Sequence, residues 1–239
     1  MLPVAILAGG LATRLRPLTE RIPKALVEVA GRPFLFHLLG WLRDQGAGRV
    51  VLCVGHLEQE IRAAVGDGRS FGLSADYSSD GGRLRGTGGA LKRALPLLGQ
   101  DFFVLYGDAY LPCSLERIQA AYFAARRPAL MAVLGNENRW DRSNVWLADG
   151  EIIEYDKRQP RPEMRHIDFG ISVLSAAVFD AYRSRTVLDL AEVWRDLSRA
   201  GQLAALEVAE RFYEIGSPKG LEETEAYLKA QRRGPESRA

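Results

Sequence analysis

A glycine-led loop near the N-terminus carries the residue types that bind a polyphosphate. Gly9 and Gly10 follow a short apolar run, residues 3–8, and the loop that they open contains Arg14 and Lys24. Two glycines let backbone N–H groups come close to an anion, because no Cβ atom stands in the way. An arginine fork matches pairs of phosphate oxygens, and a lysine adds a compact positive charge. The loop therefore predicts a site for phosphate groups.

Two other kinds of glycine-rich phosphate loop do not fit this spacing. A P-loop closes with Gly-Lys-Ser/Thr, and no such tripeptide follows Gly10. A Rossmann fingerprint needs a third glycine and an acidic residue that ends the second strand, but the apolar run 50–54 is followed by Gly55-His56. A surface turn with solvated arginines is the simple alternative, and the combined spacing of glycine, threonine, arginine and proline in the loop disfavours it.

The carboxylate of Asp108 is a second candidate for chemistry. Asp108 and Gly107 directly follow the apolar run 102–106. In an open α/β sheet, ligands bind outside the carboxyl ends of the strands. A carboxylate at that edge can hold Mg²⁺, which prefers oxygen ligands and shares them with substrate phosphates. The alternative is a plain turn residue, since Gly-Asp is a common turn pair.

The composition indicates a single domain whose partners are small anions. The 239 residues, of which 47% are hydrophobic, suffice for one large core, and a formal net charge of +2 provides no basic field for nucleic acid. With two cysteines, Cys53 and Cys113, a disulfide framework or a thiolate metal cluster is not expected. No signal peptide and no run of roughly 20 apolar residues is present. We therefore expect a cytoplasmic protein without a membrane partner, as a monomer or a small homo-oligomer.

The hydrophobic period switches repeatedly between 2 and 3.6 residues, which is typical of strands alternating with helices in a largely parallel sheet. From about residue 136 the pattern changes, because runs 145–148 and 151–155 flank Asp149-Gly150, a hairpin turn pair. The predicted fold class is α/β, a Rossmann-like mixed, mostly parallel sheet with helices on both faces and a small antiparallel insertion. Further strands are expected at 3–8, 50–54, 73–77, 102–106, 129–134, 167–174, 203–208 and 212–215, and helices at 33–46, 57–65, 88–95, 114–125, 189–200 and 221–230, with Thr87, Ser114 and Asp189 as N-caps.

From Leu7 to Leu15, and again at Pro23-Lys24, the chain resembles the sugar-1-phosphate nucleotidyltransferases. Their signature runs Leu-Ala-Gly-Gly-x-Gly-Thr-Arg-Leu-x-Pro-x-Thr and ends in Pro-Lys; Ala12 stands where the family usually has glycine. The resemblance implies the nucleotide-diphospho-sugar transferase fold. It implies catalytic roles for Arg14, Lys24 and Asp108 and contacts with the nucleotide from Leu7, Ala8, Gly9, Gly10 and Thr13.

The same resemblance implies a metal site and a second substrate site. Glu214 lies where the family usually has aspartate, in an Asp-x-Gly-x-Pro motif, and we expect it to hold Mg²⁺ together with Asp108. Asp156-Lys157 resembles a Glu-Lys pair of the family, whose carboxylate binds sugar hydroxyls and whose lysine binds the phosphate of the sugar. Residues 168–171 resemble the Asn-x-Gly-x-Tyr strand near the sugar, and this adds Asp168 and Gly170 as substrate-binding residues.

The glycine-rich run 80–90 opens a helix, a place where a base and a ribose can meet backbone amides. Gly86, Thr87 and Gly88 are therefore further nucleotide-binding candidates. Thymidylyl relatives keep a glutamine in this run, and none is present here, so thymine is not favoured. Residues 85–90 and 107–110 resemble the branch of D-glycero-D-manno-heptose 1-phosphate guanylyltransferases and N-acetylmuramate 1-phosphate uridylyltransferases.

These features lead to the hypothesis of an enzyme that transfers NMP from an NTP to a sugar 1-phosphate by Mg²⁺-assisted in-line displacement, releasing pyrophosphate. No general base is needed, because a phosphate monoester with a second pKa near 6 is already ionised at neutral pH. A heptose or hexose 1-phosphate guanylyltransferase is the preferred form. Uridylyl or cytidylyl transfer to another sugar phosphate or to phosphocholine stays open, as does a non-catalytic nucleotide-sugar-binding protein. We expect one domain, 1–230, whose nucleotide half (about 1–135) precedes a sugar-phosphate half (about 136–230), and a flexible tail, 231–239.

Overall fold

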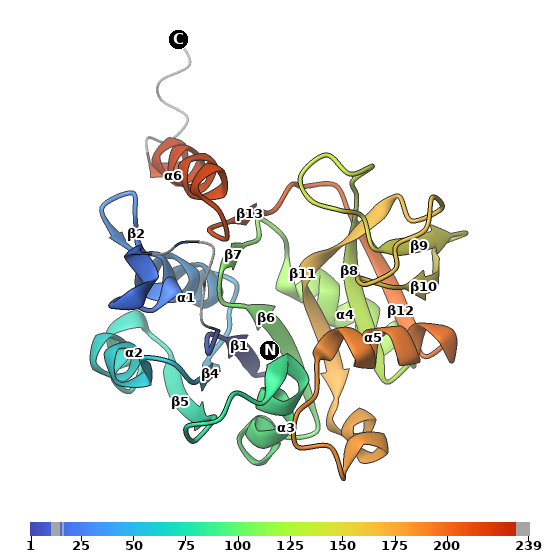
Figure 1. The fold of residues 1–239 in the computed structure, drawn as a ribbon, viewed down its shortest axis with the longest axis horizontal. Helices are drawn as coiled ribbons and strands as arrows, with labels where there is room; N and C mark the ends of the chain where they lie inside the picture. The colour runs from blue at the N-terminus through green and yellow to red at the C-terminus, as the bar shows by residue number, and fades with distance from the viewer. Residues whose placement is uncertain (11–14, 16, 233–239) are drawn as a thin grey trace.

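A mixed nine-stranded sheet forms the centre of the molecule (Figure 1). The computed structural model describes residues 1–10, 15 and 17–232. The strands lie in the order β10-β9-β11-β6-β1-β4-β5, and β8 pairs with both β11 and β12. The strands are β1 (Val4–Leu7), β4 (Arg49–Val54), β5 (Ser74–Ser79), β6 (Asp101–Tyr106), β8 (Ala129–Gly135), β9 (Val145–Ala148), β10 (Glu151–Tyr155), β11 (His166–Ser175) and β12 (Leu203–Val208).

The pairing confirms the predicted fold class. β6, β1, β4 and β5 are parallel neighbours, and β12 is parallel to β8. β11 runs antiparallel to β6 and β8, so it joins the parallel half to the later part of the chain. Short ladders outside this sheet pair β2 (Glu28–Val29) with β3 (Arg32–Pro33) and β7 (Ala109–Tyr110) with β13 (Tyr213–Glu214).

Helices cover both faces of the sheet. Successive side chains of a strand point to opposite faces, so the apolar side chains of one strand pack against helices on both sides. Val4 and Ile6 of β1 pack in one buried cluster with α1, α2 and α4, whereas Ala5 packs in a second cluster with α3 and α5. None of the helices in the described part of the chain is long and apolar enough to cross a bilayer. The α-helices are α1 (Phe34–Asp44), α2 (Glu58–Val65), α3 (Gly86–Leu98), α4 (Leu115–Ala125), α5 (Leu190–Arg199) and α6 (Pro218–Arg232), and 3-10 turns span Leu18–Glu20, Lys24–Leu26, Arg69–Phe71 and Ala176–Tyr182.

Two of the three predicted N-caps are confirmed. The Ser114 side chain accepts a hydrogen bond from the Arg117 amide at 3.2 Å, and the Asp189 side chain accepts one from the Ala191 amide at 3.0 Å. The prediction for Thr87 is wrong, since α3 begins at Gly86, two residues before the expected start at residue 88, and has Arg85 at its cap position.

The hydroxyl of Thr87 serves the neighbouring helix instead. It accepts a hydrogen bond from the Leu190 amide at 2.9 Å and donates one to Asp189 at 3.2 Å, both at the start of α5. The first amides of any helix lack partners within that helix, so a hydroxyl placed beside them by tertiary packing is used there.

The hairpin prediction is confirmed, and one helix end is corrected. β9 and β10 pair antiparallel across Asp149 and Gly150, whose φ angles of 52° and 76° are the left-handed values of a type I′ turn. The last helix, α6, continues two residues past the expected end at Ala230. Arg232 donates a hydrogen bond to the Ala30 carbonyl at 2.6 Å, which anchors that final turn.

Candidate active site

Two cavities lie next to each other at the carboxyl ends of the central strands. The first has a volume of about 310 Å³ and is lined by the segment after β1, the start of α3 and the ends of β4 and β5. The second has a volume of about 280 Å³ and is lined by β11, the segments that flank β9 and β10, and β13. Both are lined by Tyr106 and Asp108, so the end of β6 is their common wall.

The glycine loop forms one side of the first cavity. Leu7, Ala8, Gly9 and Gly10 all line it. A Cβ atom at Gly9 would lie 3.1 Å from the amide nitrogen of Gly55, so glycine lets the loop pass close to the end of β4. Gly10 has open space around its Cα atom. Its backbone can therefore meet a ligand without a side chain in between.

Two members of the predicted phosphate loop, Thr13 and Arg14, lie outside the described residues. Their roles in nucleotide binding and catalysis stay predictions.

Close packing explains the glycines at the start of α3. Gly86 has a φ of 73°, and a Cβ atom there would lie 2.5 Å from the Leu188 carbonyl oxygen. Gly86 and Thr87 line the first cavity, but Gly88 does not; a Cβ atom at Gly88 would lie 2.9 Å from the Leu188 side chain. Gly88 therefore has a packing role in this structure.

Lys24 and Asp108 form an ion pair at the junction of the cavities. The Lys24 Nζ donates to Asp108 Oδ2 at 2.6 Å, although 84 positions separate the two residues. The lysine side chain is 15% exposed and the carboxylate 35% exposed, so an incoming anion or cation can reach the pair. A short 3-10 turn after Pro23 positions the lysine, with a 2.8 Å hydrogen bond from the Leu26 amide to the Pro23 carbonyl.

Asp108 lies in the turn just before β7, next to the proposed second metal ligand in β13. Glu214 is in register with Ala109 in the β7–β13 ladder, and the Ile215 amide donates to the Asp108 carbonyl at 2.9 Å. Both side chains line the second cavity, and carboxylate oxygens are the donors that Mg²⁺ prefers. Within the described ranges, no group of three or more histidine, cysteine or acidic residues is placed to hold a metal ion. A cation here would take its remaining ligands from substrate oxygens or water.

The structure separates the two members of the Asp156-Lys157 pair. Lys157 lines the second cavity, whereas Asp156 is not among the residues that line it. Asp156 is buried and accepts hydrogen bonds of 2.8 Å from the Arg158 and Gln159 amides. Burial acts to raise the pKa of Asp156, but these amides and the nearby arginines outweigh it and hold the pKa below its usual value. The side chain stabilises the turn after β10, and its contact with sugar hydroxyls stays a prediction.

A bulge in β11 presents Asp168 to the second cavity. The pairing of β11 with β8 shifts register between Asp168 and Ser172, and Gly170 within that shift has a φ of 101°. The Gly170 amide donates to Asp168 Oδ1 at 2.9 Å. Burial raises the pKa of Asp168 to about 6, against the opposing effects of this hydrogen bond and of Lys157.

Sequence reasoning missed the loop 136–144. Asn136 is fully buried and donates to Asp141 and Ser143, which folds the loop back on itself. The loop contributes Asp141, Arg142 and Asn144 to the second cavity. Its concentration of asparagine, aspartate and serine is typical of a turn-rich segment and was the available signal. In the first cavity, sequence reasoning named the glycine-rich run 80–90 but did not single out Asp80, which directly follows β5 and lines the cavity.

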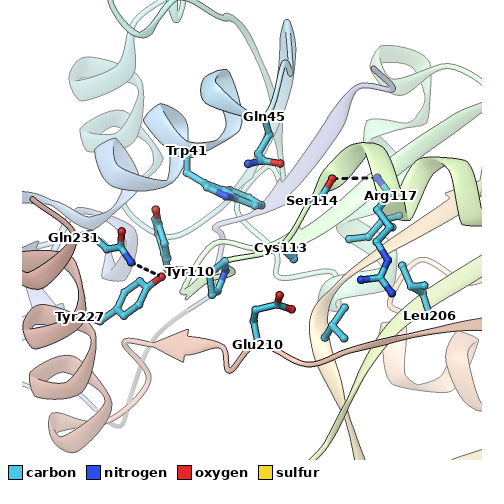
Figure 2. Close-up of a pocket in the computed structure, with 13 residues that line it drawn as sticks. Trp41, Gln45, Tyr110, Cys113, Ser114, Arg117, Leu206, Glu210, Tyr227 and Gln231 are labelled. Carbon is cyan, nitrogen blue, oxygen red and sulfur yellow. Dashed lines mark hydrogen bonds between the residues drawn. The ribbon is translucent and has the colours of Figure 1, made fainter. Parts of the chain in front are cut away.

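A third cavity, of about 400 Å³, is lined by none of the predicted site residues (Figure 2). Trp41 of α1, Tyr110 of β7 and Tyr227 of α6 line one side, and Cys113, Arg117 and Glu210 line the other. Burial raises the pKa of the Cys113 thiol to about 12, so this cysteine has little thiolate at neutral pH.

The sequence of this chain is similar to those of known nucleotidyltransferases. Residues 4–144, more than half of the chain, match the Nucleotidyl transferase family model. The chain belongs to this family. It is 33% identical over 184 residues to a glucose-1-phosphate thymidylyltransferase of Streptomyces antibioticus, covering 75% of this chain and 51% of the relative. This chain thus spans about half the length of that thymidylyltransferase.

Relatives of similar length also occur. N-acetylmuramate alpha-1-phosphate uridylyltransferase of Neisseria meningitidis is 29% identical over 237 residues, covering 92% of this chain and 96% of the relative. D-glycero-alpha-D-manno-heptose 1-phosphate guanylyltransferase of Campylobacter jejuni is 26% identical, with 90% and 94% covered. These relatives are sugar-phosphate nucleotidyltransferases, and they confirm the family resemblance.

The fold matches solved structures over nearly its whole length. The structure of a protein from Bacillus anthracis, named as a putative glucose-1-phosphate thymidylyltransferase and solved in complex with a sucrose, superposes with a TM-score of 0.85. That match covers 96% of both chains at 20% sequence identity and supports the fold alone.

Proposed function

We propose that this protein transfers NMP from an NTP to a sugar 1-phosphate and releases pyrophosphate. The observation that carries the proposal is the shared wall of the two cavities, where the Lys24–Asp108 pair of 2.6 Å lies. A nucleotide in the first cavity and a sugar phosphate in the second would meet at this pair. In-line transfer between two anions needs such placement, together with positive charge near the reacting phosphates.

The charges around the junction suit phosphoryl chemistry without a protein base. The acceptor phosphate is an ionised nucleophile at neutral pH. His37, His56 and His166 all lie in the described part of the chain, and none of them lines either cavity. Lys24 lies on the nucleotide side and Lys157 on the acceptor side, so each phosphate group has a cation of its own. Asp108 and Glu214 would hold Mg²⁺, which would screen the repulsion between the anions.

Within this class we favour a guanylyltransferase that acts on a heptose or hexose 1-phosphate. Support comes from the motifs at 85–90 and 107–110 and from the absence of glutamine in the run 80–90. Uridylyl transfer is the second candidate, favoured by the near full-length match to the N-acetylmuramate 1-phosphate uridylyltransferase. The cytoplasmic location and the oligomeric state stay predictions.

A pyrophosphate-release assay with the four NTPs and a panel of sugar 1-phosphates tests this function. Release should need both substrates and a divalent cation. Asp108→Asn keeps the side-chain shape but removes the charge, so kcat/KM should fall by about 10²-fold or more. The matched control is Asp180→Asn, an exposed carboxylate paired with Arg183, which should leave kcat/KM within about twofold. Full activity of Asp108→Asn, or no release with any substrate pair, would reject the proposal.

A further inference from the structure

Arg211 lies in the connection between β12 and β13 and joins three segments of the chain. Its guanidinium carbon Cζ lies 5.4 Å from the ring centroid of Trp140 and 5.0 Å from that of Tyr213. Its Nη2 group pairs with Glu223 of α6. Trp140 belongs to the loop 136–144, and Tyr213 belongs to β13. One side chain thus connects the loop between β8 and β9, the strand β13 and the helix α6, which meet at one end of the molecule (Figure 1).

Two ring contacts and one ion pair hold the Arg211 side chain, which is 30% exposed. A guanidinium group is planar and weakly hydrated, so it can pack on aromatic rings and pair with a carboxylate at the same time. The Nε atom of Arg211 is buried and has no hydrogen-bond acceptor among the described residues. A lysine at this position could keep the charge for Glu223 but has no planar group to lie on the rings.

The loop 136–144 is held together by its own hydrogen bonds and is attached to the sheet at its ends. Within the loop, the Trp140 amide donates to the Asn136 side chain at 3.3 Å. At the ends, the Asn136 amide donates to the Arg165 carbonyl at 2.9 Å, and the Asn144 amide donates to the carbonyl of the first residue of β11 at 3.0 Å. These bonds fix the shape and the base of the loop. The position of its middle depends on what Trp140 contacts.

Trp140 connects the middle of the loop to the wall of the second cavity. Its ring meets Phe212 edge-on at a centroid distance of 6.4 Å, and Phe212 meets Phe169 of β11 in the same way at 6.2 Å. Aromatic pairs are favourable at centroid distances of about 4.5–7 Å. Both phenylalanines line the second cavity. The loop residues that line this cavity all follow Trp140 in the chain: Asp141, Arg142 and Asn144. A shift of Trp140 would therefore move this part of the wall.

The second ring that Arg211 contacts belongs to a firmly held strand. Tyr213 directly precedes Glu214, which lines the second cavity. The Tyr213 ring stacks on Tyr227 of α6 with a centroid distance of 3.9 Å and an interplanar angle of 18°. Arg211 therefore ties the loop 136–144 to a strand that is itself packed against α6, and both the loop and the strand contribute to the second cavity.

We propose that Arg211 is a positioning residue for the acceptor substrate. By packing on Trp140 and Tyr213, it fixes the loop 136–144 against β13, and the second cavity keeps the shape that binds a sugar 1-phosphate. This inference rests on the proposed function, because it takes the second cavity as the acceptor site. Arg211 lines neither the first nor the second cavity, so it acts through the loop and not by touching a substrate.

Equilibrium binding of glucose 1-phosphate and mannose 1-phosphate tests the proposal without catalysis. Each contact between a cation and a ring corresponds to roughly 2- to 5-fold in an equilibrium constant. Arg211→Met and Trp140→Leu should therefore each raise the Kd of the tighter of the two sugar phosphates by about 3-fold or more. The Kd values of GTP and UTP should stay within about twofold of wild type. Arg211→Lys keeps the charge without the planar group, and it should still raise the sugar phosphate Kd by about 2-fold or more.

A double variant and a matched control sharpen this test. If Arg211 and Trp140 act through their mutual contact, the variant that combines Arg211→Met with Trp140→Leu should bind sugar phosphate about as weakly as the weaker single variant. The control is Arg183→Met, the loss of an exposed arginine paired with Asp180 at 2.9 Å, which should leave all Kd values within about twofold of wild type.

Amide hydrogen exchange gives a second measurement that needs no substrate. Peptides that cover residues 138–143 should exchange about 3-fold faster or more in Arg211→Met than in wild type, because the loop loses a contact that holds it. Peptides from the hairpin 145–155 should exchange at the wild-type rate.

Unchanged sugar phosphate binding or unchanged loop exchange in Arg211→Met would overturn the inference, and so would full recovery of binding in Arg211→Lys. An equal loss of sugar phosphate and nucleotide binding would overturn it as well, since that result indicates a general structural role. Failure of the wild type to bind either sugar phosphate would reject the acceptor role. Faster loop exchange with selectively weaker sugar phosphate binding, found in a protein that releases no pyrophosphate with any substrate pair, would reject the proposed function and leave the inference standing.

Discussion

At the scale of single residues, the site is a set of charges with different surroundings. Lys24 and Asp108 satisfy each other at 2.6 Å and stay accessible to ligands. Asp168 accepts a hydrogen bond from the Gly170 amide, and burial raises the pKa of Asp168 by more than this bond and the nearby Lys157 charge lower it. Asp156 is held by two amides and has a structural role in its turn. These three aspartates thus have three different environments, and burial raises the pKa of Asp168 to about 6 whereas backbone amides and arginines hold the pKa of Asp156 below its usual value.

Asp168 should make the stability of the fold depend on pH between about 4 and 6. The folded-state pKa is raised to about 6, so in this range the folded state binds more protons than the unfolded state, and the free energy of unfolding falls as the pH rises. Asp168→Asn removes this penalty. The free energy of unfolding of the variant minus that of wild type should therefore increase by at most about 3 kcal/mol from pH 4 to about 6.5. Above that pH the difference should stay constant.

Urea unfolding of both proteins at a series of pH values measures this difference. Asp149→Asn, a substitution in the exposed turn between β9 and β10, is the control and should follow wild type. A difference between Asp168→Asn and wild type that does not change with pH would show that Asp168 does not titrate in this range.

At the scale of elements, glycines determine how closely the segments of the site approach one another. Gly86 brings the start of α3 against the Leu188 carbonyl, and Gly170 allows the bulge that presents Asp168. Both have φ values in the left-handed region, which other residues adopt at a cost. Gly86 lines the first cavity and Gly170 lines the second, so the backbone conformation at each glycine contributes to the shape of a cavity.

Two substitutions can separate the energetic cost of the close contact between α3 and Leu188 from the cost of backbone strain. Gly86 and Gly99 stand at opposite ends of the helix with φ values of 73° and 82°, but a Cβ atom at Gly99 meets nothing within 4 Å. Gly99 has a ψ of −154°, a region that essentially only glycine adopts at positive φ, so Gly99→Ala should cost about 1–3 kcal/mol through strain alone. Gly86→Ala should cost at least about 1 kcal/mol more, because the new methyl group overlaps a backbone oxygen. Urea unfolding tests this ordering, and equal costs would contradict it.

The bulge in β11 should likewise require glycine. Gly170→Ala should destabilise the protein by about 1–2 kcal/mol, because the strain comes from φ and the nearest neighbours of a Cβ atom there lie at an ordinary 3.6 Å. Gly135→Ala, at the end of the adjacent β8 and without a positive φ, should change stability by less than about 0.5 kcal/mol. The free energies of unfolding of the two variants provide the comparison; similar values for both would mean that the bulge tolerates a side chain.

At the scale of the whole molecule, β11 and β6 join two ligand-sized spaces into one site. The parallel strands β6-β1-β4-β5 border the first cavity, and the later, antiparallel part of the sheet borders the second. The antiparallel pairing of β11 with β6 brings Asn144, Lys157 and residues 167–170 to the cavity that Asp108 also lines. This arrangement predicts that the two substrates can be perturbed separately.

Lys157→Met should affect the acceptor and spare the nucleotide. Lys157 lines only the second of the two cavities, so the KM for the sugar 1-phosphate should rise about 10-fold or more through the loss of a charge-assisted bond. The KM for the NTP should stay within about twofold of wild type. Lys229→Met, on the exposed side of α6 where Lys229 pairs with Glu225 at 2.8 Å, is the control for loss of a lysine. An equal rise in both KM values would contradict the separation of the two cavities.

The sequence by itself determined the fold class and the edge of the sheet where the site lies. Alternation of apolar residues is a local property, and it located the central strands, the β9–β10 hairpin and the caps at Ser114 and Asp189. The carboxyl ends of parallel strands meet at one edge, so Gly9 and Asp108 could be expected near each other before any contact was known.

Only the tertiary structure decided which side chains meet. The contact between Lys24 and Asp108 spans 84 positions, and the Thr87 hydroxyl caps a helix that begins 103 positions later. Asp80 is the first residue of the glycine-rich run 80–90, and only the fold shows that it lies after β5 at the wall of the first cavity. Such pairings depend on how distant segments pack, and no local period or spacing encodes them. For the same reason, Asp156 and Lys157 are neighbours in sequence, yet the turn after β10 places only the lysine at the second cavity.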